Sequence, residues 1–290
     1  MQRATRVPIS GVHSPVYHVS DTSSTLDLAA ALLADTTTAT PHLTTIIADH
    51  QSAGRGRLGR TWTAPDGQAL LASTIVTFPT SFPTEMLGWL VHACALSVRD
   101  ALSVRLSPLG HAVSLKWPND VLVDGARKVC GVLAQLAPAS SPFTTSAILG
   151  YGINIAQDCD HLATPQATSL YVEGDTEAGA DPTSVSHTLL AQILTGLDSR
   201  IRGLVAHRNA HDCGLADEAA SALPLLGTRI VLAKPTDPDG HPAMEGVALG
   251  LSPTGSLLVR TDDGRTHDIN AGDVLATGIP LFSTVHDTKV

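Results

Sequence analysis

Residues 54–62 read GRGRLGRTW, and the interpretation of this stretch decides between two kinds of fold. Its three glycines satisfy G-x-G-x-x-G, the fingerprint of the phosphate-binding turn in dinucleotide-binding domains. Such a turn must end a strand and open a helix, because the helix N-terminus binds the pyrophosphate. Here a turn is predicted at PDG (65–67), and the apolar, β-branched run ALLASTIVTF (69–78) predicts a buried strand. With no helix after the glycines, the sequence argues against a dinucleotide-binding domain.

The arginines between the glycines, Arg55, Arg57 and Arg60, predict a different chemistry. Glycine lets a backbone approach a ligand closely, and guanidinium groups donate to carboxylate and phosphate oxygens. We therefore expect a flexible cationic loop that closes over an anionic ligand. A solvated basic surface loop is the alternative, and the large aromatic residue Trp62 beside the loop argues against it. A protein-kinase glycine loop is disfavoured because neither H-R-D nor D-F-G follows.

Composition restricts the class of protein. The chain has 290 residues, of which 43% are hydrophobic, so it can form one large domain or a large and a small one. The net charge of −9 argues against a general nucleic-acid-binding protein. Four widely spaced cysteines without a C-x-x-C motif indicate free thiols in a reducing cytoplasm. Because there is no signal-like or membrane-length apolar run, we expect a soluble, cytoplasmic protein that does not contact membranes.

Helix-like and strand-like segments follow one another through the first three quarters of the chain. Apolar residues recur at helical spacing in three segments: 23–35, 84–106 and 183–222. HLTTIIADH (42–50) predicts a strand. Three further strand-like segments read AVSLKW (112–117), DVLVDGARKVCGVLAQLA (120–137) and TSAILGYGINIA (145–156). The second of them is expected to fold as a hairpin at Asp124-Gly125.

The sequence pattern changes after LPLLG (223–227). Short strand-like segments are separated there by the turn sequences DPDG (237–240), SPTG (252–255) and DDG (262–264), a pattern typical of a small all-β barrel or sandwich. We therefore predict a large domain at 1–222 and a small one at 223–290. The first twenty residues are too few and too polar for a separate DNA-binding module.

Two further clusters carry polar groups. KWPND (116–120) and RKVCGVL (127–133) place Lys116, Asn119, Asp120 and Lys128 around the predicted hairpin, although Asn-Asp after a proline could also serve only the turn. GYGIN (150–154) puts two glycines and an asparagine into an otherwise apolar strand. Glycines there mark the close approach of a ligand or another backbone, or else a bulge or tight packing.

Taken together and in this order, the segments resemble the biotin protein ligases, whose catalytic domains carry G-R-G-R-x-G-R-x-W, K-W-P-N-D, R-K-x-x-G-I-L and G-x-G-I-N. The resemblance covers residues 20–155 by motif and extends to the C-terminus by architecture. It implies an α+β fold with a mixed or antiparallel sheet and flanking helices, of the class II synthetase or biotin–lipoate ligase type, followed by a small SH3-like β-barrel. Many bacterial members add an N-terminal winged helix, and we expect the monofunctional type without it.

The resemblance implies an ATP-dependent ligase that forms a C–N bond. Such an enzyme joins the biotin carboxylate to the α-phosphate of ATP, releases pyrophosphate, and passes biotin from biotinyl-5′-AMP to a lysine of a biotin carboxyl carrier domain. Biotin and ATP are the implied substrates, and Mg²⁺ comes with ATP rather than in a site made by the protein alone. Because the first step brings two anions together, positive charge must be preorganised where they meet.

Site residues follow from the same resemblance. The residues expected to take part in catalysis are Lys128, Arg57, Asp120 and Lys116. Those expected at biotin are Ser24, Thr25, Gln51, Gly54, Arg55, Gly56, Arg57, Lys128 and Gly131. Those expected at ATP or the adenylate are Arg55, Arg57, Arg60, Trp62, Lys116, Asn119, Lys128 and Asn154. One departure is Leu26, which follows Ser24-Thr25 where the family usually has Ser-Thr-Asn.

Other functions remain alternatives. A lipoate or octanoate ligase shares the fold and the two-step logic, and a non-catalytic biotin or nucleotide sensor would share the fold; the complete charged motifs favour a biotin ligase. Cys159-x-His161 and His211-x-Cys213 offer only two metal ligands each, and no G-x-S-x-G supports a serine hydrolase. An exposed edge strand could pair with the acceptor domain or with a second copy as a homodimer.

Overall fold

The computed structural model describes residues 4–35, 37, 40–137, 143–233 and 242–277. The chain divides into two compact units. The first comprises Met1–Pro224 with Pro253–Gly255, and the second comprises Leu225–Ser252 with Ser256–Val290.

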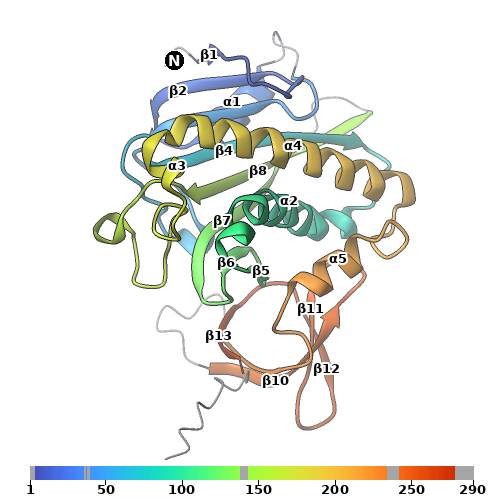
Figure 1. Ribbon diagram of the computed structural model, residues 1–290. Coiled ribbons are helices and arrows are strands. Elements are labelled where there is room, and N and C mark those ends of the chain that lie inside the picture. The colour runs from blue at the N-terminus through green and yellow to red at the C-terminus, as the bar shows by residue number, and fades with distance from the viewer. Residues whose placement is uncertain (1–3, 36, 38–39, 138–142, 234–241, 278–290) are drawn as a thin grey trace, which may run out of the picture. The chain divides into compact units, whose positions relative to one another are not determined.

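An eight-stranded mixed sheet forms the centre of the first unit (Figure 1), in the order β1-β2-β3-β4-β8-β7-β6-β5. The strands are β1 (Thr5–Arg6), β2 (Val16–Thr22), β3 (Thr45–Gln51), β4 (Ala69–Pro79), β5 (Val113–Lys116), β6 (Asp120–Val123), β7 (Arg127–Ala137) and β8 (Thr144–Asn154). β2 and β3 are parallel, and the other neighbouring pairs are antiparallel. The sheet is therefore mixed, as predicted.

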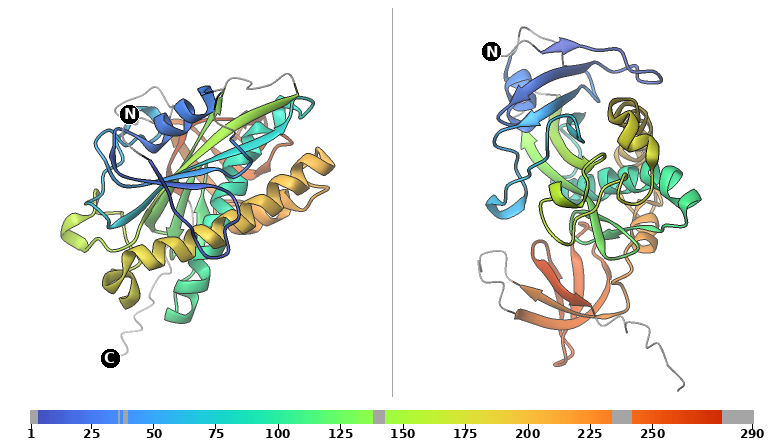
Figure 2. Two further views of the ribbon diagram at one scale, coloured as in Figure 1. Left: turned by 90° about the horizontal axis from the view of Figure 1, so that it is seen from above. Right: turned by 60° about the vertical axis from the view of Figure 1, so that its left-hand side comes forward.

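Helices cover both faces of this sheet. Helix α1 (Thr25–Ala34) lies on one face, and α2 (Trp89–Leu106) and α4 (Pro182–His207) lie on the other (Figure 2, left). The remaining helical elements are α3 (Thr176–Ala180), α5 (Leu215–Ala222), η1 (Arg57–Gly59), η2 (Thr84–Gly88), η3 (Ser107–Leu109) and η4 (Cys159–His161). The helices and the mixed sheet together confirm the α+β class for this unit.

Helix α2 belongs to the core. By length and composition the stretch Thr84–Leu109 could cross a membrane, but 61% of its most apolar window is buried inside the protein. Trp89, Leu96 and Leu102 on this helix are fully buried. Its apolar composition is thus accounted for by packing against the sheet and α4.

Local sequence signals locate most element boundaries. The predicted hairpin at Asp124-Gly125 is confirmed, with φ of 49° and 68° at these residues, as a primed two-residue turn requires. The predicted helix at 84–106 begins with the 3₁₀ turn η2. The predicted helical region 183–222 is two helices, because Arg208 (φ 54°) and Gly214 (φ 79°) adopt left-handed conformations between them. Strand β2 was not predicted from its sequence.

The second unit is a five-stranded antiparallel sheet in the order β12-β11-β10-β9-β13. Its strands are β9 (Arg229–Ala233), β10 (Pro242–Leu251), β11 (Leu257–Arg260), β12 (Thr266–Ile269) and β13 (Asp273–Thr277). Such a sheet is consistent with the small SH3-like domain, but within residues 225–233 and 242–277 the end strands do not pair, so these strands form no closed barrel. The predicted turn at 237–240 lies outside the described residues.

Candidate functional site

The glycine–arginine loop (residues 54–60) folds back on itself after β3. The Gly56 N–H donates to the Arg60 carbonyl at 2.7 Å, and the Trp62 N–H donates to the Gly54 carbonyl at 2.9 Å. At its tip, η1 places Leu58 at a φ of 57°. The next regular element is strand β4, so no α-helix follows the glycines and the dinucleotide-binding turn is excluded.

Gly54, the first residue of this loop, packs closely against two predicted site residues. A Cβ at Gly54 would lie 2.3 Å from the Trp62 carbonyl oxygen and 3.0 Å from Gln51 Nε2. Since the first contact is with backbone, no side chain fits there. The close approach fixes the start of the loop between Gln51, predicted for biotin, and Trp62, predicted for the nucleotide.

A hydrogen-bonded group of uncharged side chains lies at the start of α1. Gln51 Oε1 accepts from the Thr25 N–H at 2.8 Å and from Thr25 Oγ1 at 3.0 Å. Ser73 Oγ, on β4, donates to Thr25 Oγ1 at 2.8 Å. Beside them the buried Ser24 Oγ has no hydrogen-bond partner among the described residues. Three of the residues predicted for biotin therefore gather at one place.

The family's asparagine position has a structural role here. Leu26 packs in a core cluster with Ala29, Ile75 and Ile148. A Cβ at Gly150 would lie 3.0–3.2 Å from three atoms of the Leu26 side chain. The side chain at this position therefore serves packing, and the first glycine of GYGIN makes room for it.

The indole of Trp62 lies over glycines of two neighbouring strands. A Cβ at Gly152 would lie 2.4 Å from Trp62 Cε2, and one at Gly131 would lie 3.2 Å from Trp62 Cζ3. Gly131 and Gly152 are directly paired across β7 and β8. The GYGIN glycines therefore serve tight packing, the alternative to approach by a ligand or backbone: Leu26 packs at Gly150 and Trp62 at Gly152.

Lys128 is the cation at the centre of the predicted nucleotide residues. Its Nζ lies 5.7 Å from the centroid of the Trp62 ring, within the range of a cation–π interaction. It also forms an ion pair with Asp120 Oδ1 at 2.7 Å. The Lys128 and Asp120 side chains are 35% and 21% exposed, so both remain reachable from solvent.

The KWPND turn connects this cluster to the loop. Asn119 Oδ1 accepts from Arg57 Nη1 at 3.2 Å, and Asn119 Nδ2 donates to the Val132 carbonyl at 2.8 Å. Lys116 lies directly opposite Asp120 in the β5–β6 register. Asn119 thus holds a loop arginine beside the Lys128–Asp120 pair.

The other two loop arginines, Arg55 and Arg60, lie in different environments. Arg55 pairs with Asp27, in the first turn of α1, where the helix dipole also favours the carboxylate. Arg60 is exposed. Arg57 contacts KWPND through Asn119.

Asn154 holds the chain that runs alongside Lys128. Its Nδ2 donates to the Thr168 carbonyl at 2.8 Å, and its Oδ1 accepts from Gln157 at 3.0 Å. The Thr168 N–H donates to the Lys128 carbonyl at 2.8 Å, and the Lys128 N–H donates to the Gln166 carbonyl at 2.7 Å. The Asn154 side chain is therefore engaged in positioning this segment, and its direct contact with the nucleotide stays a prediction.

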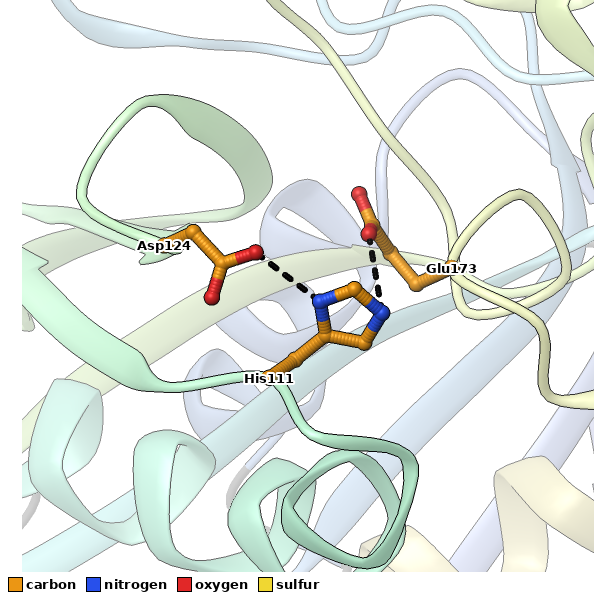
Figure 3. Close-up of side chains that lie close together, drawn as sticks. All are labelled: His111, Asp124 and Glu173. Atoms are coloured by element: carbon orange, nitrogen blue, oxygen red, sulfur yellow. Dashed lines mark hydrogen bonds and ion pairs between the residues drawn. The ribbon is translucent and has the colours of Figure 1, made fainter. Parts of the chain in front are cut away.

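A clasp of four charged or titratable residues, His111, Asp124, Arg127 and Glu173, anchors the same segment (Figure 3 shows the histidine and the two carboxylates). His111 Nδ1 lies 2.8 Å from Asp124 and its Nε2 lies 3.5 Å from Glu173. Arg127 donates to Asp124 at 2.7 Å and to Glu173 at 2.6 and 2.8 Å. Thr168 Oγ1 donates to Glu173 at 2.6 Å.

This clasp is better suited to holding structure than to holding a metal. Three potential metal-ligand atoms lie within 4.8 Å of one another, but the Arg127 guanidinium already donates hydrogen bonds to both carboxylates. The hydrogen bond from His111 lowers the pKa of Asp124 to about 2. Burial acts to raise the pKa of Glu173, but hydrogen bonds from Arg127 and Thr168 outweigh it, and the net direction is downward.

Sequence reasoning missed Ser73, Glu173 and Asp27. Ser73 and Asp27 each act on a predicted site residue from far along the chain: Ser73 is 48 residues from Thr25, and Arg55 is 28 residues from Asp27. Glu173 acts on Arg127, which directly precedes the predicted Lys128. The only local signal was a serine inside the apolar run 69–78. Contacts of this kind become visible when the sheet order is known.

Known protein families and relatives match most of this chain. Residues 20–154 match the biotin/lipoate A/B protein ligase family, and residues 236–275 match the biotin protein ligase C-terminal domain. The chain is 34% identical to the biotin–[acetyl-CoA-carboxylase] ligase of Mycobacterium tuberculosis, over 79% of this chain and 77% of that protein. It is 32% identical to the ligase of the same name from Paracoccus denitrificans, over 76% of this chain and 85% of that protein.

A solved structure is similar over almost the whole chain. The biotin protein ligase from Aquifex aeolicus, in complex with biotin and ATP, superposes with a TM-score of 0.65 at 25% identity. The match covers 91% of this chain and 98% of that one. The motifs, the fold and these relatives together lead to one conclusion: the chain belongs to the biotin protein ligase family.

Proposed function

We propose that this chain is an ATP-dependent biotin protein ligase of the cytoplasm. It forms biotinyl-5′-AMP from biotin and ATP and transfers biotin to a lysine of a biotin carboxyl carrier domain. The observation that carries the proposal is the position of Lys128, paired with Asp120, beside Trp62 and next to the arginine held by Asn119. The uncharged residues expected to contact biotin, Thr25 and Gln51, lie on the other side of Gly54.

The first step joins two anions. A biotin carboxylate oxygen attacks the α-phosphorus of ATP, and pyrophosphate leaves with the electron pair of the broken P–O bond; Mg²⁺ enters as part of the substrate Mg-ATP. Lys128 and Arg57 supply the positive charge that stabilises the transition state. Arg55, Arg60 and Lys116 contribute to the cationic surroundings of the phosphates, and Trp62 packs near the adenine.

The second step uses the carboxylate that Lys128 releases. When Lys128 turns to the phosphate, its ion pair with Asp120 breaks, and Asp120 can accept a hydrogen bond from the acceptor amine. That amine, with an unperturbed pKa of about 10.4, must lose a proton before it attacks, and Asp120 assists its transfer to solvent. The amine nitrogen attacks the acyl carbon, and AMP leaves. The glycine–arginine loop shields the mixed anhydride from water until the acceptor arrives.

The test combines the protein with biotin, Mg-ATP and an unmodified carrier domain of a biotin-dependent carboxylase, and detects biotin on the carrier by blotting and mass spectrometry. Biotin on the carrier's target lysine is the expected result. Parallel reactions with lipoate and octanoate address the related ligases. Transfer of lipoate or octanoate in preference to biotin, or binding of biotin and ATP without turnover, would overturn the proposal.

A further inference from the structure

Ser73 is a polar residue in the middle of a buried strand. It lies on β4, is 0% exposed, and is paired with Ile46 of β3 and Gly150 of β8. Burying a hydroxyl group costs free energy unless the group makes a hydrogen bond. The partner of this hydroxyl is Thr25 Oγ1, at 2.8 Å. Ser73 therefore acts on Thr25, which is expected to contact biotin, although Ser73 is not itself among the expected biotin contacts.

The direction of every hydrogen bond in this chain follows from chemistry. A backbone N–H can only donate, so the Gln51 atom that faces the Thr25 N–H must be the carbonyl oxygen Oε1. That oxygen can only accept, so the Thr25 hydroxyl, 3.0 Å away, donates to it. Because the one hydroxyl proton of Thr25 is then used, the Ser73 hydroxyl must donate to Thr25. The chain runs from Ser73 to Thr25 to Gln51.

These directions fix what the pocket offers to a ligand. Thr25 Oγ1 has no proton left, so toward a ligand it can only accept. Gln51 Nε2 keeps donor hydrogens and lies beside Gly54, where the glycine–arginine loop begins. Ser24 Oγ is buried with no partner among the described residues, which leaves it able to donate or accept. The pocket thus presents an acceptor, a donor and one adaptable hydroxyl.

A cyclic urea is complementary to this set. Its two N–H groups donate and its carbonyl oxygen accepts, and it carries no charge. An N–H can donate to Thr25 Oγ1, and the carbonyl oxygen can accept from Gln51 Nε2. If the Thr25 hydroxyl turned its proton toward the ligand, it would oppose the N–H of the urea.

We infer that Ser73 is a positioning residue that fixes the Thr25 hydroxyl as an acceptor for the ureido ring of biotin. The inference rests on the proposed function and adds to it a residue outside the sequence motifs. Ser73 contacts the substrate only through Thr25, so its effect is on biotin recognition and not on the chemistry of the phosphates.

The test measures KM for biotin, KM for ATP and kcat for Ser73→Ala, using the full chain and a carrier domain. One neutral hydrogen bond corresponds to about a two- to tenfold change in an equilibrium constant, so KM for biotin should rise by that factor. KM for ATP and kcat should stay within about twofold of the parent values. A reversibly unfolded fraction raises the apparent KM for both ligands, so KM for ATP, measured on the same variant, shows whether destabilisation contributes.

Ser146→Ala is the matched control. Ser146 is another fully buried serine of the same sheet, on β8, and its Oγ has no hydrogen-bond partner among the described residues. It should leave both KM values unchanged. The inference is overturned if Ser73→Ala has the same KM for biotin as Ser146→Ala, or if Ser73→Ala raises KM for biotin and KM for ATP equally.

A double-mutant cycle gives the second readout. Thr25→Val removes the hydroxyl through which Ser73 acts and keeps the shape of the side chain. In that background Ser73→Ala should have no further effect on KM for biotin, whereas costs that add would overturn the inference. Failure of the parent protein to label the carrier would instead overturn the proposed function, so the two failures are distinguishable.

Discussion

The two ends of the candidate site are held by opposite kinds of chemistry. At one end Ser73, Thr25 and Gln51 form a chain of uncharged hydrogen-bonding groups. At the other end the Lys128–Asp120 pair rests on a segment that the clasp of His111, Asp124, Arg127 and Glu173 anchors by charge. A neutral ring is recognised by the direction of hydrogen bonds, which neither salt nor pH alters. Phosphates are recognised by charge, and both salt and pH change the strength of that interaction.

The largest expected effect is at the charged end. Lys128→Ala should lower kcat for adenylate formation by about 10²- to 10³-fold, because it removes a preorganised charge from the transition state. The measurement is pyrophosphate release with biotin and Mg-ATP. Arg202→Ala, at a cation that is 76% exposed and paired within α4, is the control and should retain parental activity. A loss below tenfold would show that Lys128 is not the central cation.

The clasp should matter to the nucleotide and not to biotin. Glu173→Gln removes the charge that holds Arg127 and Thr168, and should raise KM for ATP by about tenfold, the factor expected for hydrogen bonds to a charged group. KM for biotin should stay within about twofold. Glu177→Gln, at a carboxylate that is 63% exposed and paired with Arg105, is the control. Equal rises in both KM values would contradict the separation of the two ends.

Acid should therefore affect the two ends differently. Asp124 and Glu173 have pKa values lowered from 3.8 and 4.5, to about 2 for Asp124. A carboxyl group whose pKa is lower in the folded than in the unfolded protein stabilises the fold above its unfolded-state pKa. That stability is lost as the pH falls through its folded-state pKa. Between pH 5 and about 2, ATP affinity should fall before biotin affinity. Isothermal titration of each ligand over this range is the measurement, and simultaneous losses would count against the comparison.

The smallest effect is expected at the contact between the loop and α1. Asp27→Asn removes the ion pair with Arg55, and both side chains are about half exposed, at 54% and 44%. An exposed pair of this kind contributes about 0–1 kcal/mol, so either KM should change by less than about fivefold. Repeating the assay near 1 M salt, where the screening length is about 3 Å, should remove the difference. A larger or salt-independent change would assign Asp27 a direct role in ligand binding.

Local patterns in the sequence were sufficient to predict much of the fold. The hairpin at Asp124-Gly125, the helix after Ser24 and the buried strand at 69–78 each have a signal within a few residues, and all three are present. Strand β2 was missed because its sequence, VYHVSDT, lacks a regular alternation, and its pairing with β3 is set by the sheet.

The candidate site was predictable in its motifs but not in its supports. Trp62, Lys128 and Asp120 stand in recognisable motifs, and the fold brings them together. Ser73 and Glu173 stand in none, because each supports a motif residue from another strand or loop. The role of Leu26 was also unpredictable, since only the sheet register places it against Gly150.

The glycines of GYGIN have a consequence for how the motif is used to recognise relatives. Gly150 and Gly152 leave space for Leu26 and Trp62 on one face of β8, while Tyr151 between them is buried and its hydroxyl lies 3.0 Å from Thr74 Oγ1. The alternation therefore encodes strand register: a shift by one residue would put a tyrosine where the indole lies. A chain can keep this motif for packing after losing Lys128, so GYGIN marks the architecture and the charged residues mark the enzyme.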